Sequence, residues 1–189
     1  GDHDDLNAIA QLKKKYKFWL HVDGAFGGMM ACSPKYAHLF AGLQAADSIT
    51  MDTHKWLNVP YDGAVMLCKH PDYQYQCFTN AASALGPAPR EASLYSLTPE
   101  GSRRLRALPA WFTLLAYGKK GYAEICERHI ALCQHYGQKV SDSPYLRLLN
   151  QVRSNVVAFT INLPDEKITA ADIQEILDQV QAQGITYSN

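Results

Sequence analysis

A short apolar stretch that ends in a lysine constrains the fold of this chain more than any other feature. Residues 48–52 (Ser-Ile-Thr-Met-Asp) alternate small or polar residues with apolar ones, as a short buried strand does. His54 and Lys55 fall in the turn where that strand must end, and Asn58 and Pro60 end any regular structure. Burial of a charged amine is costly and lowers the pKa of a lysine. We therefore expect Lys55 to be a nucleophile, although a surface lysine after a strand has the same local pattern.

A second apolar run ends in an acid. Residues 18–22 (Phe-Trp-Leu-His-Val) lead to Asp23, and the small residues that follow would let a flat group approach the backbone. An acid that ends one strand and a lysine that ends a nearby strand fit pyridoxal 5'-phosphate (PLP). The carboxylate would pair with the protonated pyridine nitrogen, and the lysine would form a Schiff base with the aldehyde.

Two motifs carry a family resemblance. His21-Val-Asp-Gly-Ala-Phe-Gly-Gly28 and Asp47-Ser-Ile-Thr-Met-Asp-Thr-His-Lys-Trp56 resemble the PLP-dependent group II amino-acid decarboxylases, such as the aromatic amino-acid and glutamate decarboxylases. The resemblance runs along essentially the whole chain but covers only the middle and later part of a family member, so we expect a fragment. It implies an α/β fold of the aspartate-aminotransferase type (fold type I). Residues 1–141 would be the later part of the PLP-binding large domain, and residues 142–189 the start of a truncated C-terminal small domain.

The resemblance also implies a site. Lys55 would form the Schiff base and, with His54, would be catalytic, while Asp23 would pair with the pyridine nitrogen. Ala25 would lie behind the cofactor ring and His54 near the phosphate. Ser102 begins a Ser-Arg-Arg segment that resembles the one by which a family member reaches the cofactor phosphate of its partner subunit. Each of three residues also has a purely structural interpretation. His54 could be a hydrogen-bonded core histidine, Ala25 could serve tight packing, and the arginines after Ser102 could form a solvated basic face.

The chain departs from the family pattern at two positions. Asp52 stands where many members have an asparagine that donates to the phosphate, which an ionised carboxylate cannot do. We expect Asp52 to orient neighbouring backbone or His54 instead. Ala84 stands where a mobile-loop tyrosine protonates the carbanion in the family, and Tyr95 is the candidate substitute.

These departures leave several functions open. The first is α-decarboxylation of an L-amino acid. The alternatives are transamination, carbon–carbon cleavage, decarboxylation coupled to oxidation to an aldehyde, or a non-catalytic fragment that only binds a partner. The family's stacking histidine and its phosphate-binding loop would lie upstream of Gly1, so we expect the isolated chain to be inactive. The full-length protein, of which this chain would be a fragment, is expected to be a homodimer.

The order strand, helix, strand, with continuous apolar runs in the strands, predicts a mostly parallel sheet covered on both faces. The lysines at 13–15 are expected at a solvated helix end, and His21 is expected to pack at a strand end. An Ala-, Gly- and Pro-rich segment, about 77–96, is predicted to be a lid loop. The predicted strands are 19–23, 48–52, 63–68 and 156–161, and the predicted helices are 5–16, 34–40, one opening at 98–100, 121–139 and 169–183.

Composition excludes several classes. Lys and Arg number 18, as do Asp and Glu, so no basic excess indicates nucleic-acid binding. No apolar run approaches the roughly 18 residues of a membrane helix. Five cysteines, an odd number without Cys-x-x-Cys spacing, indicate free thiols in the cytoplasm. Cys126, His129 and Cys133 can share a helix face, but a structural zinc site needs a fourth ligand, so no metal is expected.

Overall fold

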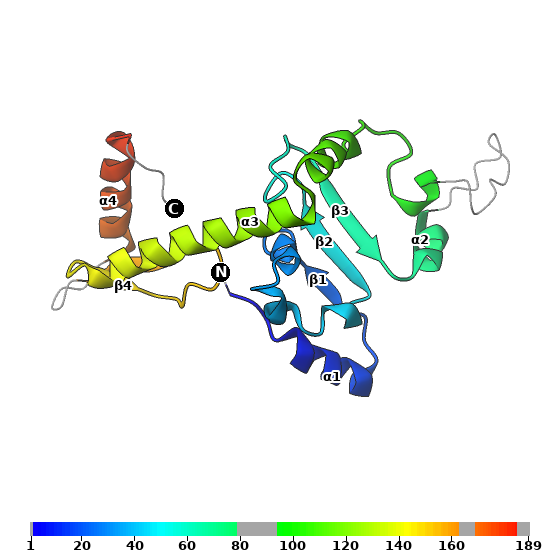
Figure 1. The fold of residues 1–189 in the computed structure, drawn as a ribbon, viewed down its shortest axis with the longest axis horizontal. Helices are drawn as coiled ribbons and strands as arrows, with labels where there is room; N and C mark the ends of the chain where they lie inside the picture. Colours follow the sequence, from blue (N-terminus) through cyan, green and yellow to red (C-terminus); the bar gives the residue numbers. More distant parts are fainter. Residues whose placement is uncertain (1, 79–93, 163–168, 185–189) are drawn as a thin grey trace. The chain divides into compact units, whose positions relative to one another are not determined.

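The computed structural model describes residues 2–78, 94–162 and 169–184. Two compact units divide the chain within a long helix: residues 3–128 form one, and residues 129–189 with the first two residues form the other. Figure 1 shows the order of the helices and strands along the chain. Within the described ranges, no helix is both long enough and apolar enough to cross a membrane.

Three strands form the sheet of the first unit, in the order β1-β2-β3 (Figure 1). Strand β1 (His21–Asp23) runs parallel to β2 (Ser48–Asp52), and β3 (Ala64–Cys68) runs antiparallel to β2. The predicted mostly parallel sheet is therefore wrong for β3. The connection of residues 53–63 is too short for a crossover helix, so β3 must return antiparallel. Three of the five β3 residues are also exposed, so the described residues do not cover both faces.

The bounds of these strands follow the sequence pattern closely. Strand β2 has the predicted limits, β3 begins one residue later than predicted, and β1 lacks the first two predicted residues. The predicted helix at 34–40 is wrong: only the short 3₁₀ helix η2 (Ala37–Phe40) lies in this range, between two further 3₁₀ helices, η1 (Gly28–Cys32) and η3 (Leu43–Ala45). Gly42 separates η2 from η3 with a φ of 97°, and a Cβ there would lie 2.5 Å from the backbone of Leu6. That close approach and the positive φ require glycine at position 42.

Helix α1 (Leu6–Tyr16) confirms the predicted amphipathic segment. The Asp5 side chain caps it by accepting the N–H of Ala8 at 2.9 Å, and Leu6 and Ala10 are its buried residues. The expected solvated lysine end is wrong for Lys13, whose Nζ reaches the carboxylate of Asp47 at 2.5 Å. A long lysine stem can lie along the helix while its amine enters a polar cluster.

Helix α2 (Pro71–Phe78) and the 3₁₀ helix η4 (Leu94–Leu97) flank the predicted lid loop. The loop prediction is wrong at both ends, because residues 77–78 belong to α2 and residues 94–96 to η4, and residues 79–93 lie outside the described ranges. The predicted helix start at 98–100 is also wrong. The hydroxyl of Thr98 donates to the carbonyl of Glu100 at 3.2 Å instead of accepting an N–H as a cap would.

Helix α3 (Ala107–Asp142) contains the predicted helix at 121–139 and the later part of the helix predicted to open at 98–100. Gly118 interrupts it with non-helical angles (φ 57°, ψ −175°), so the predicted separation into two helices is confirmed at this residue. The helix ends before Pro144, as predicted. Large apolar side chains of its first part stay exposed in the described chain, by 60% at Trp111 and 65% at Leu115.

The second unit contains a hairpin-like pair of strands and a capped helix. Strands β4 (Leu146–Leu148) and β5 (Phe159–Ile161) pair antiparallel. Only β5 was predicted, as part of a longer strand. Helix α4 (Ala170–Ala182) begins within one residue of the predicted start, and Thr169 and Asp172 form a reciprocal capping box there. The domain boundary at 141/142 stays a prediction about the parent fold.

Candidate active site

The carboxyl ends of β1 and β2 form one edge of the sheet, and this edge holds the first predicted site residues. Because the two strands are parallel, with Asp23 opposite Thr50, their ends lie side by side. Asp23 accepts the N–H of Ala25 at 2.9 Å, and the carbonyl of Ala25 accepts the N–H of Asp52 at 3.3 Å. A Cβ on Gly24 would lie 3.0 Å from the carbonyl oxygen of Thr50, so the turn after β1 passes tightly over β2. The predicted neighbourhood of Asp23, Ala25 and the end of β2 is thus present.

Lys55 lies three residues beyond Asp52 and pairs with it. The distance from Lys55 Nζ to Asp52 Oδ2 is 2.9 Å, and the lysine side chain is 37% exposed. The hydrogen bond to Asp52 raises the pKa of Lys55, and the charges of Asp52, Asp23 and Tyr61 raise it further, against a smaller lowering by desolvation. The expected lowering of this pKa is therefore wrong in the described chain. Lys55 lies beside carboxylates and remains partly open to solvent, so its charged form is favoured.

His54 occupies the other side of the same carboxylate. Its Nδ1 donates to the carbonyl of Gly63 at 3.1 Å, and its Nε2 lies 3.6 Å from Asp52 Oδ2. The Tyr61 ring stacks on the imidazole, with centroids 4.0 Å apart and planes 25° apart. Asp52 therefore lies beside His54, as expected, but its shorter contact is with Lys55. Sequence reasoning did not single out Tyr61, which directly follows the Asn-Val-Pro segment.

The turn that presents Lys55 is braced by its own neighbours. Trp56 and Leu57 are buried, whereas Lys55 and Asn58 are exposed. Asn58 adopts the left-handed region (φ 54°) and donates its N–H to the carbonyl of Lys55 at 3.1 Å. From α3, the hydroxyl of Tyr122 donates to the carbonyl of Leu57 at 3.3 Å. The two buried side chains anchor the turn and leave the lysine amine outside the core.

Ser102 lies in an exposed segment ahead of α3. Among the described residues it forms no hydrogen bond with the other predicted site residues. The arginines that follow it find carboxylates: Arg104 pairs with Asp62, and Arg106 pairs with Asp62 at 3.2 Å and with Glu100 at 3.1 Å. The hydrogen bond from Arg106 is the main cause of the lowered pKa of Asp62. Sequence reasoning expected a compensating anion here but missed Asp62.

A pocket of about 370 Å³ separates this arginine segment from the turn after β2. Thr53, Gly63 and residues 103–107 are among its lining residues. The carbonyl of Gly63 accepts hydrogen bonds from His54 and from the backbone N–H of Thr53. The wall of the pocket opposite the arginine segment is therefore part of the loop that holds His54. The segment thus lies next to the His54 loop, while Ser102 itself is not brought to Asp23 and Lys55.

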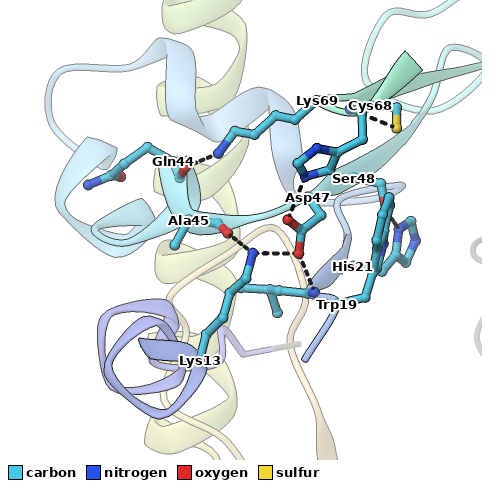
Figure 2. A network of polar contacts seen from close by, with 11 residues as sticks. Lys13, Trp19, His21, Gln44, Ala45, Asp47, Ser48, Cys68 and Lys69 are labelled. Carbon is cyan, nitrogen blue, oxygen red and sulfur yellow. Dashed lines mark hydrogen bonds and ion pairs between the residues drawn. The ribbon is translucent and has the colours of Figure 1, made fainter. Parts of the chain in front are cut away.

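A second polar cluster lies at the opposite end of the sheet (Figure 2). Asp47, just ahead of β2, accepts from Lys13 Nζ at 2.5 Å and from the N–H of Leu20 at 2.7 Å, and His70 Nε2 lies 3.0 Å from it. The Lys13 hydrogen bond, followed by that of Leu20, holds the pKa of Asp47 well below its usual range. His21 contacts the hydroxyl of Ser48 at 2.8 Å, which agrees with the expected packing role.

The side chains near Lys55 fit the functional groups of PLP. Asp23 offers an exposed carboxylate, which suits a protonated pyridine nitrogen, and Lys55 offers a primary amine, which suits an aldehyde. The imidazole of His54 and the hydroxyl of Ser102 are candidate phosphate partners. Within the described ranges, no group of three His, Cys, Asp or Glu side chains is arranged to hold a metal ion. Burial raises the pKa of the Cys126 thiol to about 12, which makes it a poor metal ligand.

Comparison with known proteins agrees with these features. The model of the pyridoxal-dependent decarboxylase conserved domain matches residues 1–162. Aromatic-L-amino-acid decarboxylase of Drosophila lebanonensis is 27% identical over 171 residues, which cover 87% of this chain and 41% of that protein. The 3,4-dihydroxyphenylacetaldehyde synthase of Aedes aegypti is 32% identical over 149 residues, 75% of this chain and 28% of that protein. The chain therefore spans less than half the length of these relatives.

Solved structures share the fold. Tryptophan decarboxylase of Catharanthus roseus, in complex with L-tryptophan, superposes with a TM-score of 0.84 at 19% identity, covering 98% of this chain and 38% of that one. The 4-hydroxyphenylacetaldehyde synthase of Rhodiola rosea gives 0.81 at 23% identity, with 97% and 38% covered. The predicted partial fold type I domain and, at the level of the family, the PLP cofactor are confirmed. The chain belongs to the pyridoxal-dependent decarboxylase family.

Proposed function

We propose that the full-length protein carrying these residues is a PLP-dependent enzyme that removes the α-carboxyl group of an L-amino acid as carbon dioxide. The observation that supports this most is the placement of Asp23 and Lys55 at adjacent carboxyl ends of two parallel strands, close enough for the carboxylate to act on the pKa of the amine. A ligand that spans the two groups would need a cationic end and a carbonyl end, which PLP has.

The residues have distinct roles in this proposal. Lys55 attaches the cofactor aldehyde, and Asp23 keeps the ring nitrogen protonated. Bound PLP supplies an electron sink for the pair of electrons left when a bond at the substrate α-carbon breaks. Ala25 supports the ring face, because its backbone joins the ends of both strands. His54 is held by Gly63 and Tyr61 in a fixed orientation in which it can contact the phosphate or the substrate.

A second candidate reaction is decarboxylation coupled to oxidation to an aldehyde. The likeness to aldehyde synthases, at up to 32% identity, favours it over transamination or carbon–carbon cleavage. The absence of a tyrosine at Ala84 points the same way, although that position lies outside the described residues. A fragment that only binds a partner is the remaining alternative, and the absence of a PLP absorbance band would favour it.

The partners follow from the same proposal. The substrate is an amino acid, and the second protein chain is another copy of the same protein, whose cofactor phosphate Ser102 approaches. The proposed location is the cytoplasm, and no metal takes part.

Two measurements on the full-length protein test the proposal. Borohydride reduction in the presence of PLP, followed by peptide mapping, should place the adduct on Lys55. An adduct mapped to Lys13 or Lys69 in its place would contradict the assignment. Product analysis for carbon dioxide, amine, aldehyde and peroxide then separates the two reactions, since only the oxidative route yields aldehyde and peroxide.

We expect the isolated 189-residue chain to turn over no substrate with added PLP, because it spans less than half the length of the relatives that it matches. Charge-assisted hydrogen bonds to phosphate normally fix such a ligand. Turnover within about a factor of ten of a full-length homologue would contradict this expectation.

A further inference from the structure

Asp52 has a contact that the family resemblance does not predict. It ends β2 and pairs with the amine of Lys55 at 2.9 Å, while His54 Nε2 lies 3.6 Å from the same oxygen. The carboxylate is more enclosed than the amine, with exposed fractions of 19% and 37%. The braced turn around Trp56 therefore sets Lys55 next to a fixed acceptor, and the amine is not left to move freely in solvent.

The groups that face Lys55 come from three segments. Asp52 ends β2 and His54 lies in the turn that follows, Asp23 ends β1, and Tyr61 belongs to the loop before β3. Both carboxylates favour the ammonium form of Lys55, and the raised pKa agrees with this. Arg104 and Arg106 pair with Asp62 and Glu100, so their charges are directed to carboxylates other than Asp52.

The protonated amine cannot attack a carbonyl, because it has no lone pair. It must first release a proton to solvent. The amine then forms a carbon–nitrogen bond, and the carbonyl oxygen leaves as water. A carboxylate at hydrogen-bond distance opposes the first step by stabilising the charge. An asparagine at position 52 could still accept a hydrogen bond, but it would supply no negative charge.

We propose that Asp52 is the positioning residue of Lys55: it fixes the amine at the carboxyl end of β2 and slows its reaction with carbonyl compounds until a ligand breaks the pair. The inference rests on the proposed attachment of PLP to Lys55 and adds control of that reaction. Stray aldehydes would meet a paired ammonium, whereas a ligand that also binds Asp23 and His54 could compete for the site.

The test measures the reactivity of each lysine without any cofactor. The full-length protein, purified without PLP, is labelled with trace acetic anhydride across a pH series and mapped by peptide mass spectrometry. Asp52→Asn should increase the labelling rate of Lys55 about two- to fivefold below its titration midpoint and move the midpoint to lower pH, as expected for a partly exposed ion pair. Asp62→Asn is the matched control, since it removes a carboxylate that pairs with arginines and should leave Lys55 unchanged.

Lys13 is the internal reference for folding, because its amine is paired with Asp47 at the far end of the sheet. If Lys13 labels faster in Asp52→Asn, the variant is perturbed, and the wild type is then labelled at low and high salt. Salt weakens exposed pairs, so it should speed Lys55 more than Lys14. Unchanged or slower labelling of Lys55 in a folded Asp52→Asn, or equal salt effects on Lys55 and Lys14, would overturn the proposal. A PLP adduct on another lysine would reject the function while leaving this labelling result intact.

Discussion

Each end of β2 has a carboxylate that holds a lysine, and the two pairs differ in how completely they are enclosed. Asp47 at the amino end binds Lys13, the N–H of Leu20 and His70 (Figure 2). Asp52 at the carboxyl end has one close partner, Lys55, and a longer contact with His54. The lysine side chain is 22% exposed in the first pair and 37% exposed in the second.

We infer from this difference in exposure that the Lys13–Asp47 pair supports the fold, whereas the Lys55–Asp52 pair can exchange partners. Asp47 joins three segments, since Lys13 comes from α1, Leu20 precedes β1 and His70 follows β3. Removing it would leave several donors without their acceptor, which is costly inside a protein. Asp52 and Lys55 come from one short segment, so breaking their contact disturbs no other element. A ligand can therefore replace one partner at the carboxyl end of β2 but not at the amino end.

The largest expected effect is at the exposed lysine. Lys55→Ala in the full-length protein should lower turnover about a thousandfold or more, because Lys55 is the amine that the proposal assigns to attachment of the cofactor. The fold should persist, since the Lys55 side chain is not part of the core. Steady-state product formation and the PLP absorbance band measure the two losses.

Lys13→Ala is the contrasting variant. It should reduce stability while the protein that remains folded keeps its activity, because Lys13 lies at the far end of the sheet. Equal loss of turnover in the two variants, measured on folded protein, would remove the distinction between the two pairs.

The next effect concerns Asp23, which is on the same edge as Lys55. Asp23→Asn should lower turnover about a hundredfold, in the range of a lost acid–base contribution, while PLP binding weakens much less. The amide can still hydrogen-bond, but it does not hold the ring nitrogen protonated. Turnover and PLP dissociation are measured on the same preparation. Near-normal turnover would show that the Asp23 carboxylate is not needed.

The sequence predicted the carboxyl end of β2 better than the amino end. Asp23 and Lys55 stand out because each chemical group follows a short apolar strand, so two local patterns define the site. Tyr61 and Asp62 do not stand out, since their contacts with His54 and Arg106 depend on how the loop before β3 folds back. The raised pKa of Lys55 depends on the side-chain position of Asp52, which spacing alone does not give.

The amino end of β2 was missed because its partners are far apart in the sequence. Lys13 looks like one of three solvated lysines until α1 packs beside the sheet. The antiparallel direction of β3 was also missed. Its apolar run is compatible with either direction, and only the short connection of residues 53–63 indicates the antiparallel one. The limits of β2 and β3 and the start of α4 were readable because they depend on near neighbours alone.

A smaller effect, on stability, is expected at Asp47. Asp47→Asn should lower the free energy of unfolding by about 2 kcal/mol near pH 7, the range for lost hydrogen bonds to a charged group. The folded-state pKa of Asp47 is depressed, so its contribution is present above the unfolded pKa of about 3.9 and is lost as pH falls through the folded value. Urea unfolding at pH 7 and pH 3 should show the gap between wild type and variant narrowing in acid. A constant gap would contradict the charge-based explanation.

The smallest expected effect is that of Asp52→Asn on thermal stability. This pair is partly open to water, and exposed ion pairs contribute little, so the melting temperature should fall by only about one or two degrees. Its pH dependence should be opposite to that of Asp47. The folded-state pKa of Lys55 is raised, so the contribution is present below the unfolded lysine value of about 10.4 and is lost as pH rises through the folded value. Melting curves at pH 8 and pH 11 should therefore show the small gap closing in alkali, whereas the Asp47→Asn gap narrows in acid. A fall as large as that of Asp47→Asn would mean that Asp52 also supports the fold, and the contrast between the two ends of β2 would then be lost.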